Sequence, residues 1–422
     1  MLPTPSPAAP SRLQSTVLAE TVAAPSSSSA SGIRSVSIVT PAAPTVASAA
    51  RTTVLPRIEV RGEQAELVFD GKERFEKIRV LGEGGLGEVV GAHDHDIGRK
   101  VAIKRLKAEV RSPAALARFV DEIRTIGKLD HPNIIPIHDV GMDEQGDLYF
   151  VMKYVDGETL ESIIEKLAAG DPQYHRHYTF ERRVEIFRNL LEALAFAHDK
   201  GVIHRDLKPA NVMIGKFGEV MLMDWGIAKS LKSGIPELPM VSGNTPPAPG
   251  ATARAFETQL GSLIGTPLYM APEQAAGLPT DERSDVYSAC MLFFELLYLR
   301  HPFRDKLSLD EVLQAARTEE IPLQDRSNPH QPPVPAELMW LLRHGLKKNP
   351  HERYASVRAM MDILDRRADG EIKVECPVTA AKHMGMQSTR FVDKHPIAFF
   401  TIALSFAALF VTFAVIAIRS MA

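Results

Sequence analysis

The stretch "HRDLKPAN", His204–Asn211, places an aspartate, a lysine and an asparagine close together, directly before a strand-like "VMI". Lys208 follows Asp206 by two residues, and Asn211 follows it by five. A carboxylate can orient and deprotonate a hydroxyl group, a lysine can neutralise a phosphate, and an asparagine oxygen can bind Mg²⁺. Taken alone, each residue is more often an ordinary surface or capping residue. The rest of the chain must show whether they act together.

A second oxygen ligand follows in "MLMDWG", where Asp224 precedes Trp225. Asn211 and Asp224 would suit a hard cation such as Mg²⁺. The order of these groups along the chain therefore indicates chemistry on a phosphate.

Upstream, "RVLGEGGLGEVVGAHD", Arg79–Asp94, is rich in glycine. A single glycine pattern is a weak signal that fits a dinucleotide loop, an ATP loop or a plain hairpin. A dinucleotide fold would continue from the glycines into a helix, whereas these glycines lie between two strand-like runs. The second run ends in "VAIK" at Lys104, and the next predicted helix offers Glu122 as an acidic partner. This order favours an ATP loop.

Together, these motifs resemble the protein kinase family, in particular the eukaryotic-like (Hanks-type) serine/threonine kinases of bacteria. The resemblance covers residues 75–365 and implies a bilobal α+β fold. A small β-rich N-lobe is expected at about 75–155, a larger helical C-lobe at about 156–365, and an activation segment at 224–273.

The resemblance implies roles for the matching residues. Asp206 would be the catalytic base and Lys208 would contact the γ-phosphate, while Asn211 and Asp224 would hold the metal ions. The cofactors would be ATP and Mg²⁺, with Mn²⁺ as an alternative metal. The positions expected to bind ATP are Leu81, Gly82, Glu83, Gly84, Gly85, Leu86, Gly87, Glu88, Val89, Ala102, Lys104, Met152, Lys153 and Val155.

Within this set, Lys104 would bind the α- and β-phosphates and pair with Glu122. Met152 resembles the gatekeeper, and the backbones of Lys153 and Val155 resemble the hinge that binds adenine. Among the structural positions, Asp285 would anchor the catalytic loop, Glu273 would be buried against Arg353, and Arg205 would pair with an activation-loop phosphate.

Lys208 and Thr266 match serine/threonine kinases, so the acceptor should be a Ser or Thr hydroxyl. Two features depart from the family pattern: Trp225 replaces the usual phenylalanine, and the activation segment carries a Pro/Gly/Ser/Thr-rich insertion that predicts a mobile loop. We expect autophosphorylation there at Thr258, with Thr252 and Ser262 as lesser candidates. An insertion that only extends the loop is the alternative.

The composition argues against two other classes of protein, nucleic-acid-binding proteins and disulfide-rich proteins. The net charge of −3 gives no electrostatic footprint for nucleic acid, and two cysteines exclude a disulfide framework and favour a reducing, cytosolic setting. Residues 1–56 are rich in Pro, Ser and Ala and contain no aromatic residue, so a disordered tail is expected.

The C-terminal part predicts a membrane anchor. After a mixed polar juxtamembrane linker at 366–394, residues 397–418 contain no charge, glycine or proline. A helix of this length would span about 30 Å, the thickness of a bilayer core. Flanking cations favour a cytoplasmic kinase domain, single-pass and tail-anchored in the bacterial inner membrane. Tethering could bring copies together as a homodimer that phosphorylates in trans.

The sequence therefore predicts a membrane-tethered serine/threonine protein kinase that acts on protein substrates. A pseudokinase scaffold at the membrane is the alternative from another class, although every group needed for the reaction is present. A small-molecule phosphotransferase is a weaker third hypothesis, because "GTPLYMAPE" and Asp285 match a region that docks peptides.

Overall fold

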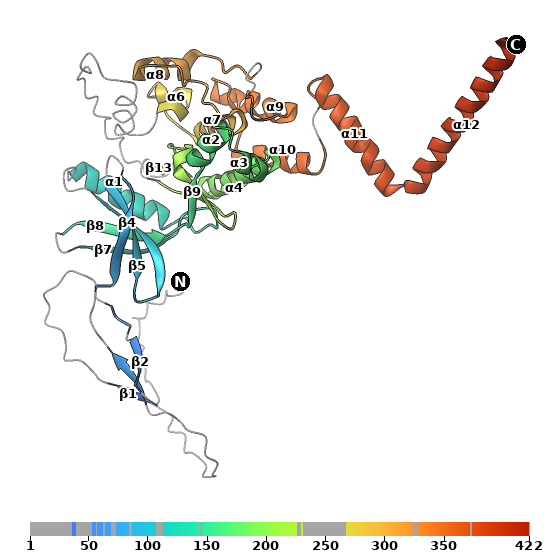
Figure 1. Ribbon diagram of the computed structural model, residues 1–422. Helices are drawn as coiled ribbons and strands as arrows, with labels where there is room; N and C mark the ends of the chain where they lie inside the picture. Colours follow the sequence, from blue (N-terminus) through green and yellow to red (C-terminus); the bar gives the residue numbers. More distant parts are fainter. Residues whose placement is uncertain are drawn as a thin grey trace, which may run out of the picture. The chain divides into compact units, whose positions relative to one another are not determined.

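The computed structural model describes residues 36–38, 53–55, 57–61, 64–68, 73–83, 87–106, 113–143, 146–225, 229–230, 267–323, 328–371 and 374–421 (Figure 1). The chain divides into two compact units. The first comprises Met1–Pro44 and Val54–Gly71, and the second comprises Thr45–Thr53 and Lys72–Ala422.

The first unit contains a three-stranded sheet in the order β1-β3-β2. Strand β1 (Val36–Ile38) runs parallel to β3 (Gln64–Val68), and β2 (Arg57–Arg61) pairs with β3 in an antiparallel hairpin. The expectation of disorder over residues 1–56 is wrong for β1, whose β-branched Val36 and Ile38 favour a strand once a partner is present. Apart from residues 53–55, the rest of that stretch lies outside the described residues.

The second unit begins with a five-stranded antiparallel sheet in the order β4-β5-β6-β8-β7. Its strands are β4 (Phe75–Glu83), β5 (Gly87–Asp94), β6 (Arg99–Leu106), β7 (Ile137–Met142) and β8 (Leu148–Lys153). Helix α1 (Pro113–Ile126) packs on this sheet through Phe119, whose ring lies 5.4 Å from that of Phe150. Burial of such aromatic pairs fixes the helix on the sheet.

A larger helical part follows. It contains α2 (Leu160–Ala168), α3 (Pro172–His177), α4 (Phe180–Asp199), α6 (Pro272–Ala275), α7 (Glu282–Tyr298), α8 (Leu309–Thr318), α9 (Ala336–Gly345) and α10 (Val357–Ala368). Side chains cap several N-termini: the Thr159 hydroxyl accepts from the backbone N–H of Ser162, and Asp281 accepts from that of Arg283. Such caps satisfy N–H groups that lack a partner within the helix.

The expected succession of a strand-rich part and a helical part is confirmed.

Helix α7 forms the centre of this part, since its side chains are buried on nearly all sides. Phe293 on α7 stacks on Phe187 of α4 with ring centres 3.9 Å apart. A helix that is apolar all round must be enclosed by other elements. Helix α7 is therefore a rigid support for the loops that cross it.

Short strands lie on either side of the loop formed by residues 204–211. A small sheet has the order β12-β11-β9, with β9 (Gly157–Thr159), β11 (Val212–Gly215) and β12 (Val220–Leu222). Strand β10 (Val202–Ile203) pairs with β13 (Lys229–Ser230). The 3₁₀ turns are η2 (Pro209–Asn211), η3 (Pro267–Tyr269) and η4 (Pro350–Glu352). Residues 204–211 thus lie between β10 and β11, with both ends held in strands.

Two helices end the chain, α11 (Pro377–Lys394) and α12 (Pro396–Met421) (Figure 1). The stretch expected as a juxtamembrane linker, residues 366–394, contains α11, which packs beside α9. There the Lys382 ammonium lies 3.0 Å from Glu337 and Thr379 is buried. This tertiary support stabilises a helix that composition alone did not indicate.

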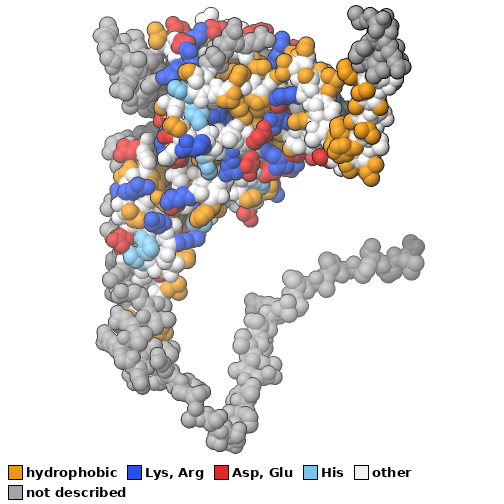
Figure 2. Space-filling view, turned by 45° about the vertical axis from the view of Figure 1, so that its right-hand side comes forward, with side chains coloured by type: hydrophobic (Ala, Val, Ile, Leu, Met, Phe, Trp, Pro, Cys, Tyr) orange, Lys and Arg blue, Asp and Glu red, His pale blue; other side chains and the backbone are white. Residues whose placement is uncertain are grey.

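The structure gives the expected membrane anchor no support. Among the residues described, none of the helices combines the length and the apolar character needed to cross a bilayer. The expected span at 397–418 lies within α12, and the side chains from residue 413 onward lie outside the described residues. The side chains before that point are mostly apolar and exposed (Figure 2), as in Ile397, Leu404 and Phe410.

Candidate active site

Lys104 connects three elements. It lies near the end of β6, where its ammonium is 2.6 Å from Glu122 Oε1 on α1 and 2.6 Å from Asp224 Oδ1 after β12. Burial would lower the pKa of Lys104, but the two carboxylates outweigh it and leave the pKa raised. The lysine is therefore a fixed positive charge. The expected pairing of Lys104 with Glu122 is present, and the contact with Asp224 is an additional finding.

The two carboxylates differ in their pKa shifts. Burial raises the pKa of Glu122 despite the lysine, whereas Lys104 outweighs the burial of Asp224 and leaves the pKa of Asp224 lowered. Asp224 is thus held ionised, as a metal ligand must be. Asn211 and Asp224 carry oxygen donors of the type that Mg²⁺ prefers. The donor chemistry fits the expected metal.

The residues of the opening motif lie together. The Lys208 ammonium is 3.0 Å from Asp206 Oδ2, and the Asn211 amide donates to the same oxygen at 3.2 Å and to the Asp206 carbonyl at 2.9 Å. Turn η2 begins after Lys208 and brings Asn211 back towards Asp206. The Asp206 carboxylate is thereby oriented by two donors.

Asp285 lies beneath this loop on α7 and is fully buried. Its carboxylate accepts from the backbone N–H groups of His204 at 2.8 Å and Arg205 at 3.0 Å, and His198 Nε2 lies 2.8 Å away. Burial would raise the pKa of Asp285, but these contacts lower it. The structure thus places Asp285 where an anchor of the loop is expected.

His204 has a defined tautomer in this arrangement. Burial lowers the pKa of His204, so the ring is neutral. The Met223 carbonyl lies 3.2 Å from Nε2 and can only accept a hydrogen bond, which places the proton on Nε2. Nδ1 then accepts from the backbone N–H of Asp206 at 3.3 Å. The imidazole links the loop of Asp206 to the segment before Asp224.

Two residues of the site adopt left-handed backbone conformations: Arg205 and Asp224 both have a φ of 68°. For residues other than glycine this conformation costs of the order of 1–3 kcal/mol. It persists only where surrounding contacts impose it. Such contacts exist for both residues, from Asp285 to Arg205 and from Lys104 to Asp224.

Trp225, at the position where the family usually has phenylalanine, is only 1% exposed and its ring lies 4.5 Å from His204. The larger ring is thus accommodated inside the protein. Its indole N–H has no hydrogen-bond partner within the described part of the chain. Indole differs from a phenyl ring in carrying this N–H donor.

Glu273 and Arg353 form a buried ion pair with two contacts of 2.8 and 2.7 Å. Ser284 donates a further hydrogen bond to Glu273, and Arg353 also donates to three backbone carbonyls, at Lys347, Lys348 and Arg283. The pair joins α6 to the segment before α10.

The ATP-binding positions are described in part. Gly84, Gly85 and Leu86 lie outside the described residues, as do Thr252, Thr258, Ser262 and Thr266. Gly82 pairs with Val89 across β4 and β5, and Glu88 forms an ion pair with Arg105. Leu81 and Glu83 are exposed, Ala102, Met152 and Val155 are buried, and Lys153 ends β8. An added Cβ at Gly87 would meet the Arg105 carbonyl at 2.4 Å, so only glycine fits there.

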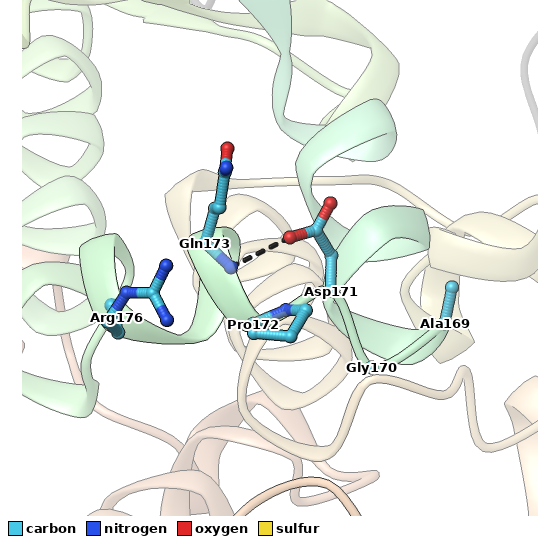
Figure 3. A pocket seen from close by; sticks show the side chains of 6 residues that line it. All are labelled: Ala169, Gly170, Asp171, Pro172, Gln173 and Arg176. Atoms are coloured by element: carbon cyan, nitrogen blue, oxygen red, sulfur yellow. Dashed lines mark hydrogen bonds between the residues drawn. The ribbon is translucent and has the colours of Figure 1, made fainter.

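One surface depression lies away from these residues. It is lined by Ala169, Gly170, Asp171, Pro172, Gln173 and Arg176, where α2 passes into α3 (Figure 3). Asp171 caps α3 by accepting from the backbone N–H of Gln173 at 2.8 Å, which accounts for its position. This depression holds none of the expected catalytic groups. The polar cluster around Asp206 and Asp224 is therefore the candidate site.

Sequence reasoning missed several residues that contact the loop. His198 contacts Asp285, while Gln274 and Thr280 contact Arg205. A histidine, a glutamine and a threonine at these places form no motif with the catalytic groups. Only the folded chain brings them together.

Comparison with known proteins gives a consistent result. The family model described as "Protein kinase domain" matches residues 75–364. The chain is 35% identical over 327 residues to a probable serine/threonine-protein kinase of Streptomyces coelicolor, covering 76% of this chain and 43% of that protein.

Two further relatives have similar coverage. The serine/threonine-protein kinase PknB of Mycobacterium tuberculosis is 36% identical over 303 residues, which is 71% of this chain and 44% of PknB. PknD of Protochlamydia amoebophila is 33% identical over 307 residues, which is 72% of this chain and 30% of PknD. The chain thus spans less than half the length of these relatives.

Proposed function

Because this chain belongs to the protein kinase family, among the bacterial serine/threonine kinases, we propose that it transfers the γ-phosphoryl group of Mg-ATP to Ser or Thr hydroxyls of proteins. The observation that carries this proposal is the geometry of Asp206, whose carboxylate is oriented by Lys208 and Asn211. Asn211, one of the two residues that would hold the metal, is thus in direct contact with the proposed base.

Each of these residues would have its own role in the phosphoryl transfer. Asp206 would orient the acceptor hydroxyl and take its proton, while Lys208 would neutralise charge on the transferred phosphoryl group. Lys104 would hold the α- and β-phosphates, and Asn211 and Asp224 would hold the metal, which would neutralise part of the phosphate charge. Most of the catalysis would then come from positioning and electrostatic stabilisation.

The first test is phosphoryl transfer itself. The purified chain, incubated with Mg²⁺ and ATP labelled at the γ-phosphate, should label protein on serine and threonine but not on tyrosine. Chelation of Mg²⁺ should abolish the label. Absence of label, together with retained ATP binding, would contradict the proposal and favour a pseudokinase scaffold.

Autophosphorylation is part of the proposal. It is supported by the hydroxyl-rich activation segment, in which Thr258 is the first candidate and Thr252 and Ser262 follow. Phosphopeptide mapping of the labelled chain should find phosphate at Thr258. Finding these three residues unmodified while other sites are filled would contradict this part alone.

Membrane attachment through residues 397–418 remains a prediction from the sequence, based on the absence of charge in that segment. Removal of residues 395–422 should move the protein from the membrane fraction to the soluble fraction of the cell. The truncated chain should keep its kinase activity, which serves as the control for folding. Equal membrane recovery of both chains would contradict the prediction.

A further inference from the structure

Arg205 is held through three of its groups by one segment of the chain, Gln274–Asp285. Its backbone N–H donates to Asp285 Oδ1 at 3.0 Å, and its carbonyl accepts from Gln274 Nε2 at 2.9 Å. Its guanidinium donates from Nη2 to Thr280 Oγ1 at 2.6 Å. The conformation of this one residue is therefore determined from several directions.

The orientation of Gln274 is fixed by chemistry. The Arg205 carbonyl can only accept, so the Gln274 amide must present its NH₂ group there. The Gln274 Oε1 atom is then buried without a hydrogen-bond partner among the described residues. The contact with Arg205 therefore uses the donor end of the Gln274 amide.

Gln274 and Thr280 each lie next to a residue that is held in place by its own contacts. Gln274 follows Glu273, which is ion-paired with Arg353, and Thr280 precedes Asp281, which caps α7. Side chains positioned from fixed backbone hold their partners more accurately than side chains on loose loops. Gln274 and Thr280 can therefore transmit the rigidity of α6 and α7 to Arg205.

Arg205 immediately precedes Asp206 and has a left-handed backbone with a φ of 68°. Release of Arg205 from this conformation would change the direction of the next peptide and move the Asp206 carboxylate. A displacement of about 1 Å in a reacting group can cost about 100-fold in rate.

We propose that Thr280 and Gln274 are positioning residues that clamp Arg205 and thereby hold Asp206 in its reactive orientation. This proposal rests on the function proposed above. It goes beyond that function because it assigns the positioning of Arg205 to two uncharged groups, the Thr280 hydroxyl and the Gln274 amide. Both groups lie outside the insertion of the activation segment.

The test compares Thr280→Val, which removes the hydroxyl but keeps the shape, with Thr280→Ser, which restores it. Thr280→Val should lower kcat about tenfold, because loss of one hydrogen bond to a charged group raises the barrier by about that much. The KM for ATP should stay within about twofold of wild type. Thr280→Ser should regain most of kcat. Gln274→Met, of similar length, should lower kcat in the same way.

The matched control is Thr318→Val at the exposed end of α8, where the hydroxyl donates to the Gln314 carbonyl of its own helix. It should leave kcat unchanged. Wild-type kcat in both Thr280→Val and Gln274→Met, or an equal loss in Thr280→Ser and Thr280→Val, would overturn the proposal.

Amide hydrogen exchange provides a second measurement that needs no activity. Thr280→Val should speed exchange at Arg205 and Asp206, while the amides of α4 stay protected as in wild type. If wild type transfers no more phosphate than Asp206→Asn, the function proposed above is wrong. The clamp is tested separately: unchanged amide exchange at Arg205 and Asp206 in Thr280→Val would overturn it.

Discussion

Asp206→Asn should lower kcat for phosphoryl transfer by about 10³-fold, in the range expected for loss of a general base. Asparagine has nearly the same size and can still accept hydrogen bonds from Lys208 and Asn211, which lie 3.0 and 3.2 Å from Asp206 Oδ2. It cannot take the proton of the acceptor hydroxyl. The KM for ATP should change little, because Lys104 and the metal ligands are untouched.

Asp199→Asn is the matched control for this experiment. Asp199 lies at the end of α4 in an exposed ion pair with Arg358, and such pairs contribute little. This variant should keep kcat within about twofold of wild type. Incorporation of labelled phosphate at the wild-type rate by Asp206→Asn would show that another residue, or a contaminating kinase, is responsible.

Arg353→Met should destabilise the second unit by about 3–5 kcal/mol, because it leaves the Glu273 carboxylate without its cation. The Arg353 side chain is 0% exposed and Glu273 is 8% exposed, so water cannot replace the lost partner. The Arg353 hydrogen bonds to the carbonyls of Lys347 and Lys348 are lost as well. Urea unfolding followed by helical circular dichroism measures the effect.

Arg300→Met provides the comparison, because Arg300 and Asp305 form an ion pair with side chains 50% and 74% exposed. Its loss should change the free energy of unfolding by less than about 0.5 kcal/mol. The double variant Glu273→Met with Arg353→Met should recover part of the stability lost in Arg353→Met, since no unpaired charge remains. Equal effects of Arg353→Met and Arg300→Met would contradict this account.

Much of the site could be predicted because its residues lie in short, ordered motifs. Asp206, Lys208 and Asn211 are close in sequence, so the turn at η2 is sufficient to bring them together. The predicted pairing of Lys104 with Glu122 depends only on a strand and the next helix. These contacts need little knowledge of the tertiary fold.

The remaining contacts depend on packing between distant segments. Lys104 and Asp224 are 120 residues apart, and Arg205 and Thr280 are 75 apart. Threonine and glutamine are common on surfaces, so nothing in their local sequence marks Thr280 or Gln274. Helix α11 was missed for a similar reason, since its stability depends on contacts with α9.

Trp225 gives the site an intrinsic fluorophore. The chain contains two tryptophans, and the other, Trp340, lies on α9. A Trp340→Phe variant would leave a single indole, buried one residue after Asp224 and 4.5 Å from the His204 ring. Its emission would then report directly on movement of the Asp224 segment, without any attached dye.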